Sequence, residues 1–315
     1  MTFLPAKESS LGPFRRIRHF LRTSRPLRLL VRNRPAMCAL AFLMFVLFLA
    51  VFGPVIAPHD PNAQTLTNSF APPNAEHWLG TDIYGRDYVS RLLVSARVTT
   101  LAMVQAVGIA TVLGIPFGLV AGLVGGWLGA LFSRISDGLQ SLPPLILAIA
   151  IVGILGPSLT NSMIAVGIVL APPVFRLARG AAESVATETY IEACRALGCS
   201  NWQLLWRHVL PNASSPLLVQ LAFSAGVAIV AEASLSFLGL GVQPPQTSWG
   251  SMLRDAFDHV YEFPAALVAP ALMIVGTVLA LSTFGDGLRD ALEGTGTAVK
   301  VKALGFGRSR NVRGS

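Results

Sequence analysis

The residue types that most often carry enzyme chemistry are few in this chain, and their spacing fits no catalytic pattern. None of the histidines belongs to the His-Glu-x-x-His spacing of a zinc helix. No Gly-x-Ser-x-Gly elbow presents a serine nucleophile, and no lysine follows a glycine as a phosphate-binding P-loop requires. We therefore expect no catalytic residue, no metal site and no cofactor bound by this chain. The histidines are His19, His59, His77, His208 and His259.

The cysteines are Cys38, Cys194 and Cys199. Cys38 falls inside an apolar run, whereas the other two lie in a segment that we place in the cytoplasm, where thiols stay reduced. A C-x4-C spacing without a nearby histidine is a weak metal pattern. We interpret these cysteines as packing residues and keep a metal pair as the weaker alternative.

Glu232 is the only acidic residue inside a long apolar stretch. Ionisable groups are costly within a membrane, so such a residue is a functional candidate by default. One interpretation places Glu232 on the translocation path of a polar solute or at its gate. Two others make it structural, as a partner in an interhelical hydrogen bond or as a side chain that reaches the outer interface. The sequence does not choose between these interpretations.

The composition indicates the setting of these residues. Hydrophobic residues make up 53% of the chain and charged residues only 13%, where a soluble domain carries about 25% charge. The net charge of +8 sits mainly in tails and loops, which argues against a nucleic-acid interface. The chain is therefore predicted to be an all-α integral membrane protein.

Long uncharged stretches, close to the roughly 20 residues that a spanning helix needs, predict six transmembrane helices. The first is expected to be retained rather than cleaved as a signal peptide, because its apolar run is too long and no small-x-small site follows. Breaks are expected at Gly156-Pro157 and near Pro143-Pro144 and Pro172-Pro173. The predicted spans are 36–57, 98–124, 139–155, 162–175, 216–240 and one between Glu262 and Asp286.

Lysine and arginine in the loops predict that both termini lie in the cytoplasm, because only Arg86, Arg91 and Arg254 then fall in outer loops. Apolar residues at helical spacing among the arginines of 14–22 predict either a helix lying on anionic lipid or a disordered basic tail. The expected segments are a basic cytoplasmic tail (1–35), the first helix (36–57), an extracytoplasmic loop (58–96), a core of five helices with a cytoplasmic loop at 178–211 (97–290) and a second cytoplasmic tail (291–315).

The second span carries Gly114, Gly118, Gly122 and Gly126 in steps of four. Glycines at this spacing share one helix face and let another helix approach closely. Pro116 on the same helix predicts a kink. We expect this face to pack tightly inside the bundle, which suits a moving transporter or a static bundle.

The loop 178–211 is predicted to form two short amphipathic helices. Thr189 and Glu192 have the spacing of a capping box, and Gly198 can end the first helix in a left-handed turn. The apolar stripe of this helix consists of Tyr190, Ala193, Cys194 and Leu197.

The second helix begins with another capping box, Ser200 with Gln203, and is expected to end at Pro211. Its apolar residues are Trp202, Leu205, Trp206 and Val209. Apolar faces in the cytosol need a surface to bury against, which could be lipid headgroups or a groove on a partner protein.

The same loop resembles the EAA loop of the permease subunits of ABC importers. The family pattern is Glu-Ala-Ala, three residues, Gly, nine residues and Ile-x-Leu-Pro. The start matches Glu192, Ala193 and Cys194, with cysteine replacing the second alanine, and Gly198 stands at the required distance. The end matches the run His208-Val209-Leu210-Pro211, in which histidine replaces isoleucine as peptide-importer permeases often have it. Within residues 36–293, the stretches 77–82, 85–92, 235–250 and 285–290 resemble the C-type permease of dipeptide and oligopeptide importers.

The resemblance implies a type I ABC importer permease fold and a non-catalytic transport subunit in the inner membrane of a prokaryote. It implies that a separate ATPase docks on the loop and uses the ATP. The implied partners are a second homologous permease, two ATP-binding subunits, an extracytoplasmic substrate-binding protein and membrane lipid, without nucleic acid. The implied docking residues are Glu192, Ala193, Cys194, Leu197, Gly198, His208, Leu210 and Pro211.

The resemblance implies di- or oligopeptides as substrate, with glutathione, nickel complexes or another small polar solute as alternatives. A gradient-driven secondary transporter is the alternative class. It would need intramembrane charge pairs for ion coupling, and only Glu232 is available. A structural or assembly protein without transport is the third class.

Overall fold

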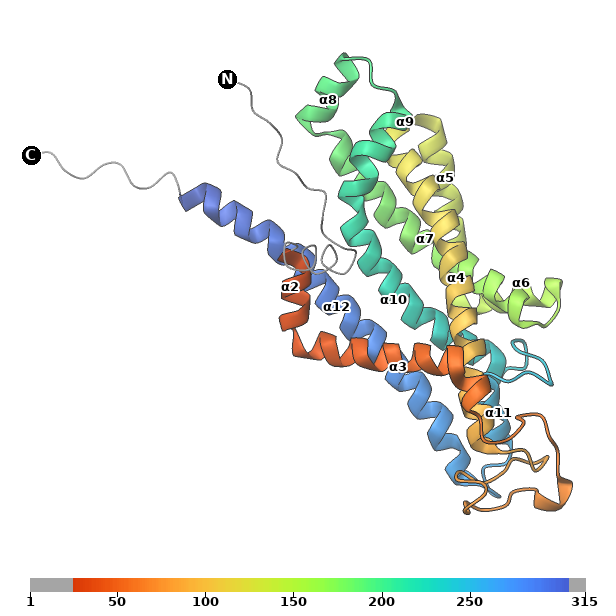
Figure 1. Cartoon of the computed structure of the whole chain (residues 1–315). Helices are drawn as coiled ribbons and strands as arrows, with labels where there is room; N and C mark the ends of the chain where they lie inside the picture. The colour runs from red at the N-terminus through yellow and green to blue at the C-terminus, as the bar shows by residue number, and fades with distance from the viewer. Residues whose placement is uncertain (1–24, 306–315) are drawn as a thin grey trace, which may run out of the picture.

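The computed structural model describes the backbone of residues 25–305 and the side chains of residues 28–292. The described chain is an elongated bundle of helices (Figure 1). The helix predicted within 14–22 lies outside the described residues. A short helix, α2 (Arg25–Arg32), falls inside the predicted basic tail and packs against the last helix of the bundle.

Five continuous helical segments are long and apolar enough to cross a membrane. They are α3 (Arg34–Ile56), α4 (Tyr88–Val124), α7 (Leu159–Ala186), the run Asn201–Phe237 and the run Pro264–Leu292. The run Asn201–Phe237 comprises α9 (Asn201–Leu204), the π-helical η2 (Leu205–Val209) and α10 (Leu210–Phe237). The last run comprises η3 (Pro264–Leu267) and the first part of α12 (Val268–Gly305).

The predicted third span is not one helix. Two helices occupy this region, α5 (Gly126–Gln140) and α6 (Pro144–Leu155), and they are bent by 94° with respect to each other. The break lies at Pro143-Pro144, as predicted, because proline lacks an N–H and forces the preceding residue out of the helical region. Six spans are therefore reached only if the bent pair counts as one.

The predicted break at Pro172-Pro173 is wrong, because α7 runs without interruption past both prolines. The neighbouring Val174 and Ala178 are completely buried, and α7 packs extensively against α4. This packing offsets the cost of about 3 kcal/mol that a proline imposes inside a helix. Sequence reasoning weighs the proline but cannot weigh the contacts around it.

Several helix boundaries in the structure also differ from the predicted ones. The second span begins at Tyr88 rather than near Val98, because Asp87 accepts a hydrogen bond from the backbone N–H of Ser90 and caps α4. The loop before α4 therefore ends at Asp87 rather than at residue 96. The helix α7 extends to Ala186 and shortens the predicted loop 178–211, while α12 continues to Gly305 into the predicted tail 291–315.

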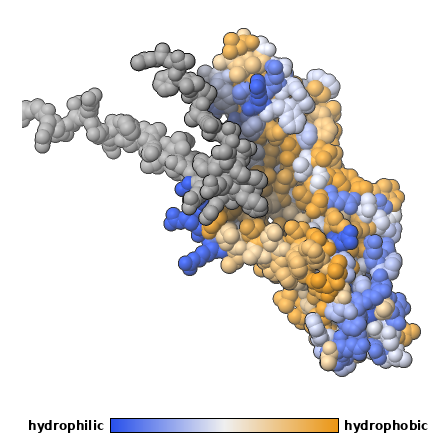
Figure 2. Space-filling view, viewed as in Figure 1, coloured by the Kyte–Doolittle hydropathy of each residue, from blue (hydrophilic) through white to orange (hydrophobic). Residues whose placement is uncertain are grey.

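The two ends of the bundle differ (Figure 1). One end carries α8 (Thr189–Ala196) and α9, and the opposite end carries α11 (Trp249–Asp258) and the loop 57–87, which contains η1 (Leu66–Asn68). Hydrophilic surface gathers at the α11 end, and hydrophobic surface dominates the middle (Figure 2). Exposed side chains such as Val55 (81% exposed) and Val112 (66%) belong to spanning helices, as expected where lipid is the solvent.

The most extensive helix–helix contact among the described residues joins α4 to α7, and glycines line it. A Cβ atom on Gly118 would lie 2.5 Å from the carbonyl oxygen of Phe175, and Gly114 and Gly122 likewise leave no room for one. The prediction that Gly126 shares this face is wrong. The helix α4 ends at Val124, and Gly126 opens α5 with a φ of +60° and open space around it.

Candidate functional site

The segment between α7 and α10 folds into a helical hairpin, which we call the α8–α9 hairpin (residues 189–204). Gly198 forms its turn with a φ of +86°, as predicted for a left-handed cap. The N–H of Gly198 donates to the carbonyl of Arg195, and the N–H of Cys199 donates to the carbonyl of Cys194. These two bonds make a Schellman motif, which ends α8 sharply and sets the direction of α9.

The capping of the two helices is only half as predicted. The Ser200–Gln203 capping box is present with both reciprocal hydrogen bonds. The Thr189–Glu192 box is absent, because α8 begins one residue earlier in register, with Glu188 as its N-cap and no side-chain bond. Pro211 does not end the second helix, since the π-helical turn η2 leads directly into α10 with Pro211 in its first turn.

Apolar contacts anchor the hairpin to the bundle through a residue that the sequence analysis missed. Ile191 on α8 is completely buried, as are Leu204 on α9 and Val209 on η2. They share a core cluster with Ala178 and Ala182 of α7. Of the predicted stripe of α8 only Cys194 packs against this cluster, and the completely buried residue of α8 is Ile191. The helix α8 has only 8 residues, which is too short for hydrophobic periodicity to identify its buried face.

Large apolar side chains are exposed among polar ones on the hairpin and on the adjoining η2. Leu197 is 85% exposed, and Tyr190, Trp202 and Trp206 are also exposed. The rings of Trp202 and Trp206 pack edge to face with their centroids 5.4 Å apart. We call these four side chains the hairpin patch. Figure 2 shows hydrophobic surface at this tip of the molecule. An exposed apolar patch on a rigid turn indicates an interaction site.

The structure brings a histidine to the hairpin cysteines, contrary to the sequence analysis. Nε2 of His208 lies 4.0 Å from Sγ of Cys194, and the His208 and Tyr190 rings are 5.8 Å apart. Burial and the adjacent Cys199 raise the pKa of the Cys194 thiol, so it stays protonated at neutral pH. A protonated thiol is a poor nucleophile and a poor metal ligand. We therefore interpret the contacts of His208 with Cys194 and Tyr190 as packing at the base of the hairpin.

The remaining predicted docking residues lie around this base. Glu192 and Ala193 are exposed on α8, and Leu210 and Pro211 begin α10. Nδ2 of Asn212 donates a hydrogen bond to the carbonyl of His208 at 2.8 Å and another to the Tyr190 hydroxyl at 3.1 Å. The geometry thus gathers all eight predicted docking residues at one end of the bundle, the end that carries α8 and α9 (Figure 1).

The α11 end contains a polar cavity of about 680 Å³. An ion network borders it. Nε of Arg86 lies 2.6 Å and Nε of Arg91 lies 3.4 Å from Asp82, and Nη2 of Arg91 lies 3.8 Å from Asp255.

Arg91 is buried, and its Nη1 has no hydrogen-bond partner among the described residues. Burial raises the pKa of Asp255, and Arg91 partly opposes this. Arg254 and Asp258 also line the cavity.

Glu232 lies one side chain away from this cavity. It is completely buried in α10, so the interpretation as a side chain at the outer interface is wrong. Its Oε1 accepts a hydrogen bond from Ser236 on the same helix at 2.7 Å, and Ser236 lines the cavity. A role of Glu232 on the path stays a prediction.

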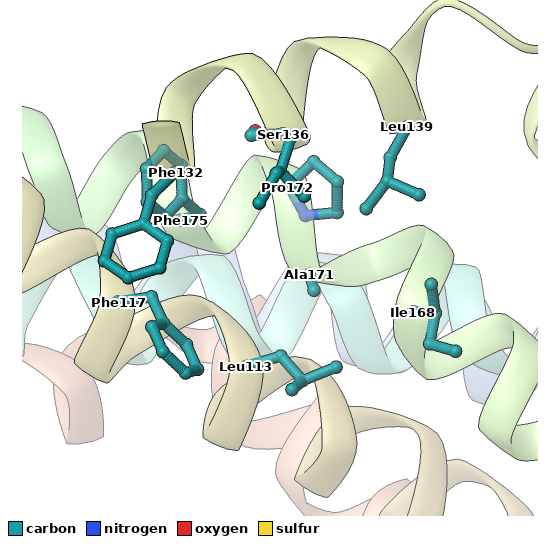
Figure 3. Close-up of a pocket in the computed structure, with 10 residues that line it drawn as sticks. Leu113, Phe117, Phe132, Ser136, Leu139, Ile168, Ala171, Pro172 and Phe175 are labelled. Carbon is teal, nitrogen blue, oxygen red and sulfur yellow. The ribbon is translucent and has the colours of Figure 1, made fainter. Parts of the chain in front are cut away.

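A second pocket, of about 230 Å³, lies between α4, α5 and α7 (Figure 3). It is almost entirely apolar, with Ser136 as the one hydroxyl-bearing side chain among its ten lining residues. Phe117 and Phe132 pack against each other at one side of it, with ring centroids 5.0 Å apart. It offers no groups for catalysis.

Comparison with known protein families identifies the family of this chain. Residues 114–294, more than half of the chain, match the family described as "Binding-protein-dependent transport system inner membrane component". The chain belongs to this family. Residues 24–73 of the permease also match the "N-terminal TM domain of oligopeptide transport permease C". The prediction of a binding-protein-dependent importer permease is confirmed.

Curated relatives extend over most of the permease. The "Probable D,D-dipeptide transport system permease protein DdpC" of Escherichia coli K12 is 41% identical over 80% of this chain and 84% of its own. The "Di/tripeptide transport system permease protein DppC" of Pseudomonas aeruginosa is 42% identical over 83% and 88%. The "Glutathione transport system permease protein GsiD" of Escherichia coli O6:K15:H31 is 42% identical over 83% and 87%.

The fold has a counterpart among solved structures. The permease is similar to a chain of the MetNI methionine ABC transporter in an inward-facing conformation, with a TM-score of 0.54, 19% identity, and coverage of 64% of this chain and 96% of the other. At this identity the likeness concerns the fold. The prediction of an all-α permease of the type I importer fold is confirmed.

Proposed function

We propose that the permease forms half of the translocation pathway of an ATP-driven importer of di- or oligopeptides. Its partners are a second homologous permease, two ATP-binding subunits beneath it and an extracytoplasmic binding protein that delivers the substrate. The ATP-binding subunits hydrolyse ATP, and the binding protein captures the substrate. The permease itself therefore contributes no catalytic residue and binds no cofactor. The names of its relatives, two of which specify di- or tripeptides, support the substrate class.

The hairpin patch is the observation that carries the coupling role. Leu197, Trp202 and Trp206 project from a hairpin whose opposite face is locked into the core by Ile191 and Leu204. A rigid apolar projection fits the helix-in-groove mode of protein recognition. A separate ATPase that grips this patch would therefore move the bundle with it rather than bend a loop.

The contacts of the hairpin define a route for that movement. Ile191 packs in one cluster with α7, and the glycines Gly114, Gly118 and Gly122 lock α7 to α4. The second arm of the hairpin continues through η2 into α10. Closing of the ATPases would pull α7, α4 and α10 together and rock the two permeases between inward-open and outward-open states.

The orientation follows from the positive charges. We place the α8–α9 end and both chain termini in the cytoplasm of a prokaryote and the α11 end on the outer side of the inner membrane, because few lysines and arginines lie in the loops of the α11 end. The cavity at the α11 end then faces the binding protein. Its paired arginines and aspartates suit a zwitterionic solute such as a short peptide.

A second candidate substrate is glutathione, which the name of one relative specifies. Glutathione is itself a small peptide with charges of both signs, so the same cavity would suit it. Competition for uptake by dipeptides and by glutathione in the complete transporter distinguishes the two.

The coupling role is tested in the reconstituted transporter. Leu197→Asp removes the most exposed apolar group of the hairpin patch, and Gly198→Asp and Glu192→Lys alter the turn and α8. We expect all three variants to insert into the membrane and to lose ATP-driven uptake, while Leu197→Met keeps an apolar group of similar size and retains uptake. Normal uptake by Leu197→Asp would overturn docking at this patch, and uptake without nucleotide would favour a gradient-driven transporter.

A further inference from the structure

Three side chains of metal-ligating types meet within the loop 57–87 at the α11 end of the bundle. His59 follows α3, His77 lies in the loop 57–87, and Asp87 caps α4. Nδ1 of His77 lies 2.9 Å from Oδ1 of Asp87, and Nδ1 of His59 lies 3.8 Å from Oδ2. One ligand atom from each residue lies within 4.8 Å of the other two.

The positions of these side chains are fixed by α4. The Ser90 hydroxyl accepts a hydrogen bond from the backbone N–H of His59 at 3.0 Å, and it donates one to Oδ2 of Asp87 at 2.7 Å. The rings of His59 and His77 stack at a tilt with centroids 5.0 Å apart. The site is therefore held by the first turn of a spanning helix rather than by loop residues alone.

One nitrogen in this cluster has no protein partner. Nδ1 of His59 is buried and makes no hydrogen bond among the described residues, although it faces the Asp87 carboxylate. A buried polar atom without a partner is costly, and an ion between the three groups would satisfy it. The His59 side chain is 34% exposed overall, which leaves a way in for an ion from solvent.

The spacing suits a small divalent metal ion. Two atoms that each lie about 2.0–2.2 Å from one zinc ion are at most about 4.4 Å apart. In a tetrahedral site such atoms lie roughly 3.4 Å apart. The separations of 2.9 and 3.8 Å to Asp87 fall on either side of this value, and all three ligand atoms lie within 4.8 Å of one another. Zinc binding therefore requires a side-chain movement that replaces the His77–Asp87 hydrogen bond with metal bonds.

The donor set selects the type of metal. Two neutral imidazoles and one carboxylate suit zinc and similar transition metals, whereas calcium and magnesium prefer oxygen ligands. Burial works to raise the pKa of Asp87, but hydrogen bonds from Ser90 and His77 outweigh it and keep the pKa below its ordinary value. Aspartate is ordinarily anionic at neutral pH, so it can serve as a ligand without losing a proton.

We propose that His59, His77 and Asp87 bind a zinc ion that fastens the loop 57–87 and the end of α3 to the start of α4. None of the three residues lines the large polar cavity, so the ion is a structural clip rather than cargo on the path. Sequence analysis predicted no metal site, because no two of these ligands have a recognised motif spacing. The proposal is independent of the substrate and of ATP coupling.

The test uses the full-length permease, purified without a polyhistidine tag and with its three cysteines replaced by alanine. The protein is stripped with EDTA and titrated with zinc chloride. We expect one zinc per chain and a rise in melting temperature. His59→Gln and His77→Gln should weaken zinc binding at least tenfold and abolish the rise, while His259→Gln, a histidine at the same end, should change neither.

Cobalt and a ligand exchange make the test independent of folding defects. His59→Cys keeps a ligand, so it should bind Co²⁺ and add a sulfur-to-cobalt charge-transfer band that the parent protein lacks. In EDTA the His59→Gln and His59→Cys variants should melt as the parent does, because Nδ1 of His59 makes no hydrogen bond among the described residues. Equal zinc binding by the parent and His59→Gln, or a His59→Cys variant without the new band, would overturn the proposal.

Discussion

At the scale of single residues, Gly198 sets the geometry of the hairpin, because its backbone conformation favours a residue without a Cβ atom. Its φ of +86° costs an L-residue about 1–2 kcal/mol, and asparagine tolerates this region better than alanine. We expect Gly198→Ala to reduce ATP-driven uptake several-fold and Gly198→Asn to reduce it less, at equal membrane expression. Co-purification of the ATPase with each variant reports docking directly. Within the permease a Cβ at Gly198 meets open space. The same loss for both variants would therefore indicate a clash with the docked ATPase instead of backbone strain.

Asp87 is the second such residue, because it caps α4 and carries a lowered pKa. In EDTA, Asp87→Ala should lower stability by about 1 kcal/mol through loss of the N-cap, and Asp87→Asn should lower it less because asparagine also caps. A folded-state pKa below the ordinary value of 3.8 means that the charge stabilises the fold above that value and stops doing so as the pH falls through the folded-state pKa.

The melting temperatures of the parent and Asp87→Asn should therefore converge as the pH is lowered below about 3.8. Tryptophan fluorescence in detergent follows this melting. A difference that grows as the pH falls would show that the capping network does not hold the carboxylate in its charged form.

At the scale of the elements, the contact between α4 and α7 depends on glycine. Gly118→Ala would place a Cβ 2.5 Å from the Phe175 carbonyl oxygen and 2.7 Å from the Cβ of Ala178, so the helices must separate. We expect a clear fall in melting temperature and, because α7 and α4 transmit motion from the hairpin, a loss of uptake.

Gly108 on the same helix provides the matched control. A Cβ there meets nothing within 4 Å, and alanine favours a helix over glycine by about 1 kcal/mol. Gly108→Ala should leave the melting temperature unchanged or raise it. Equal destabilisation by the two substitutions would mean that helix flexibility, rather than close approach to α7, explains the glycines.

At the scale of the whole molecule, the orientation places the α8–α9 hairpin and the loop 57–87 on opposite sides of the membrane. Ala75 and Ala196 are exposed at the two ends and can each be replaced by cysteine in a background without native cysteines. In intact cells, a membrane-impermeant maleimide should label Ala75→Cys and spare Ala196→Cys. Permeabilised cells should label both, and labelling of Ala196→Cys from outside would refute the orientation and the docking role together.

The sequence by itself determined the class of the protein. Long apolar stretches with charge confined to their ends predict spanning helices because the hydrocarbon thickness imposes a length on each. The turn at Gly198 and the capping box at Ser200 were also predictable, since each depends on interactions within a few residues. For the same reason the break at Pro143-Pro144 could be read from the chain alone.

Only the tertiary structure decided the features that depend on contacts between distant segments. It carried α7 through Pro172-Pro173 and made Ile191 the buried residue of α8, because in both places packing against neighbouring helices outweighs local preference. It also placed Glu232, through Ser236, next to a cavity lined by Arg91, and it folded the loop 57–87 so that His59 and His77 contact Asp87. These contacts depend on how distant segments pack together, and no local sequence pattern specifies that packing.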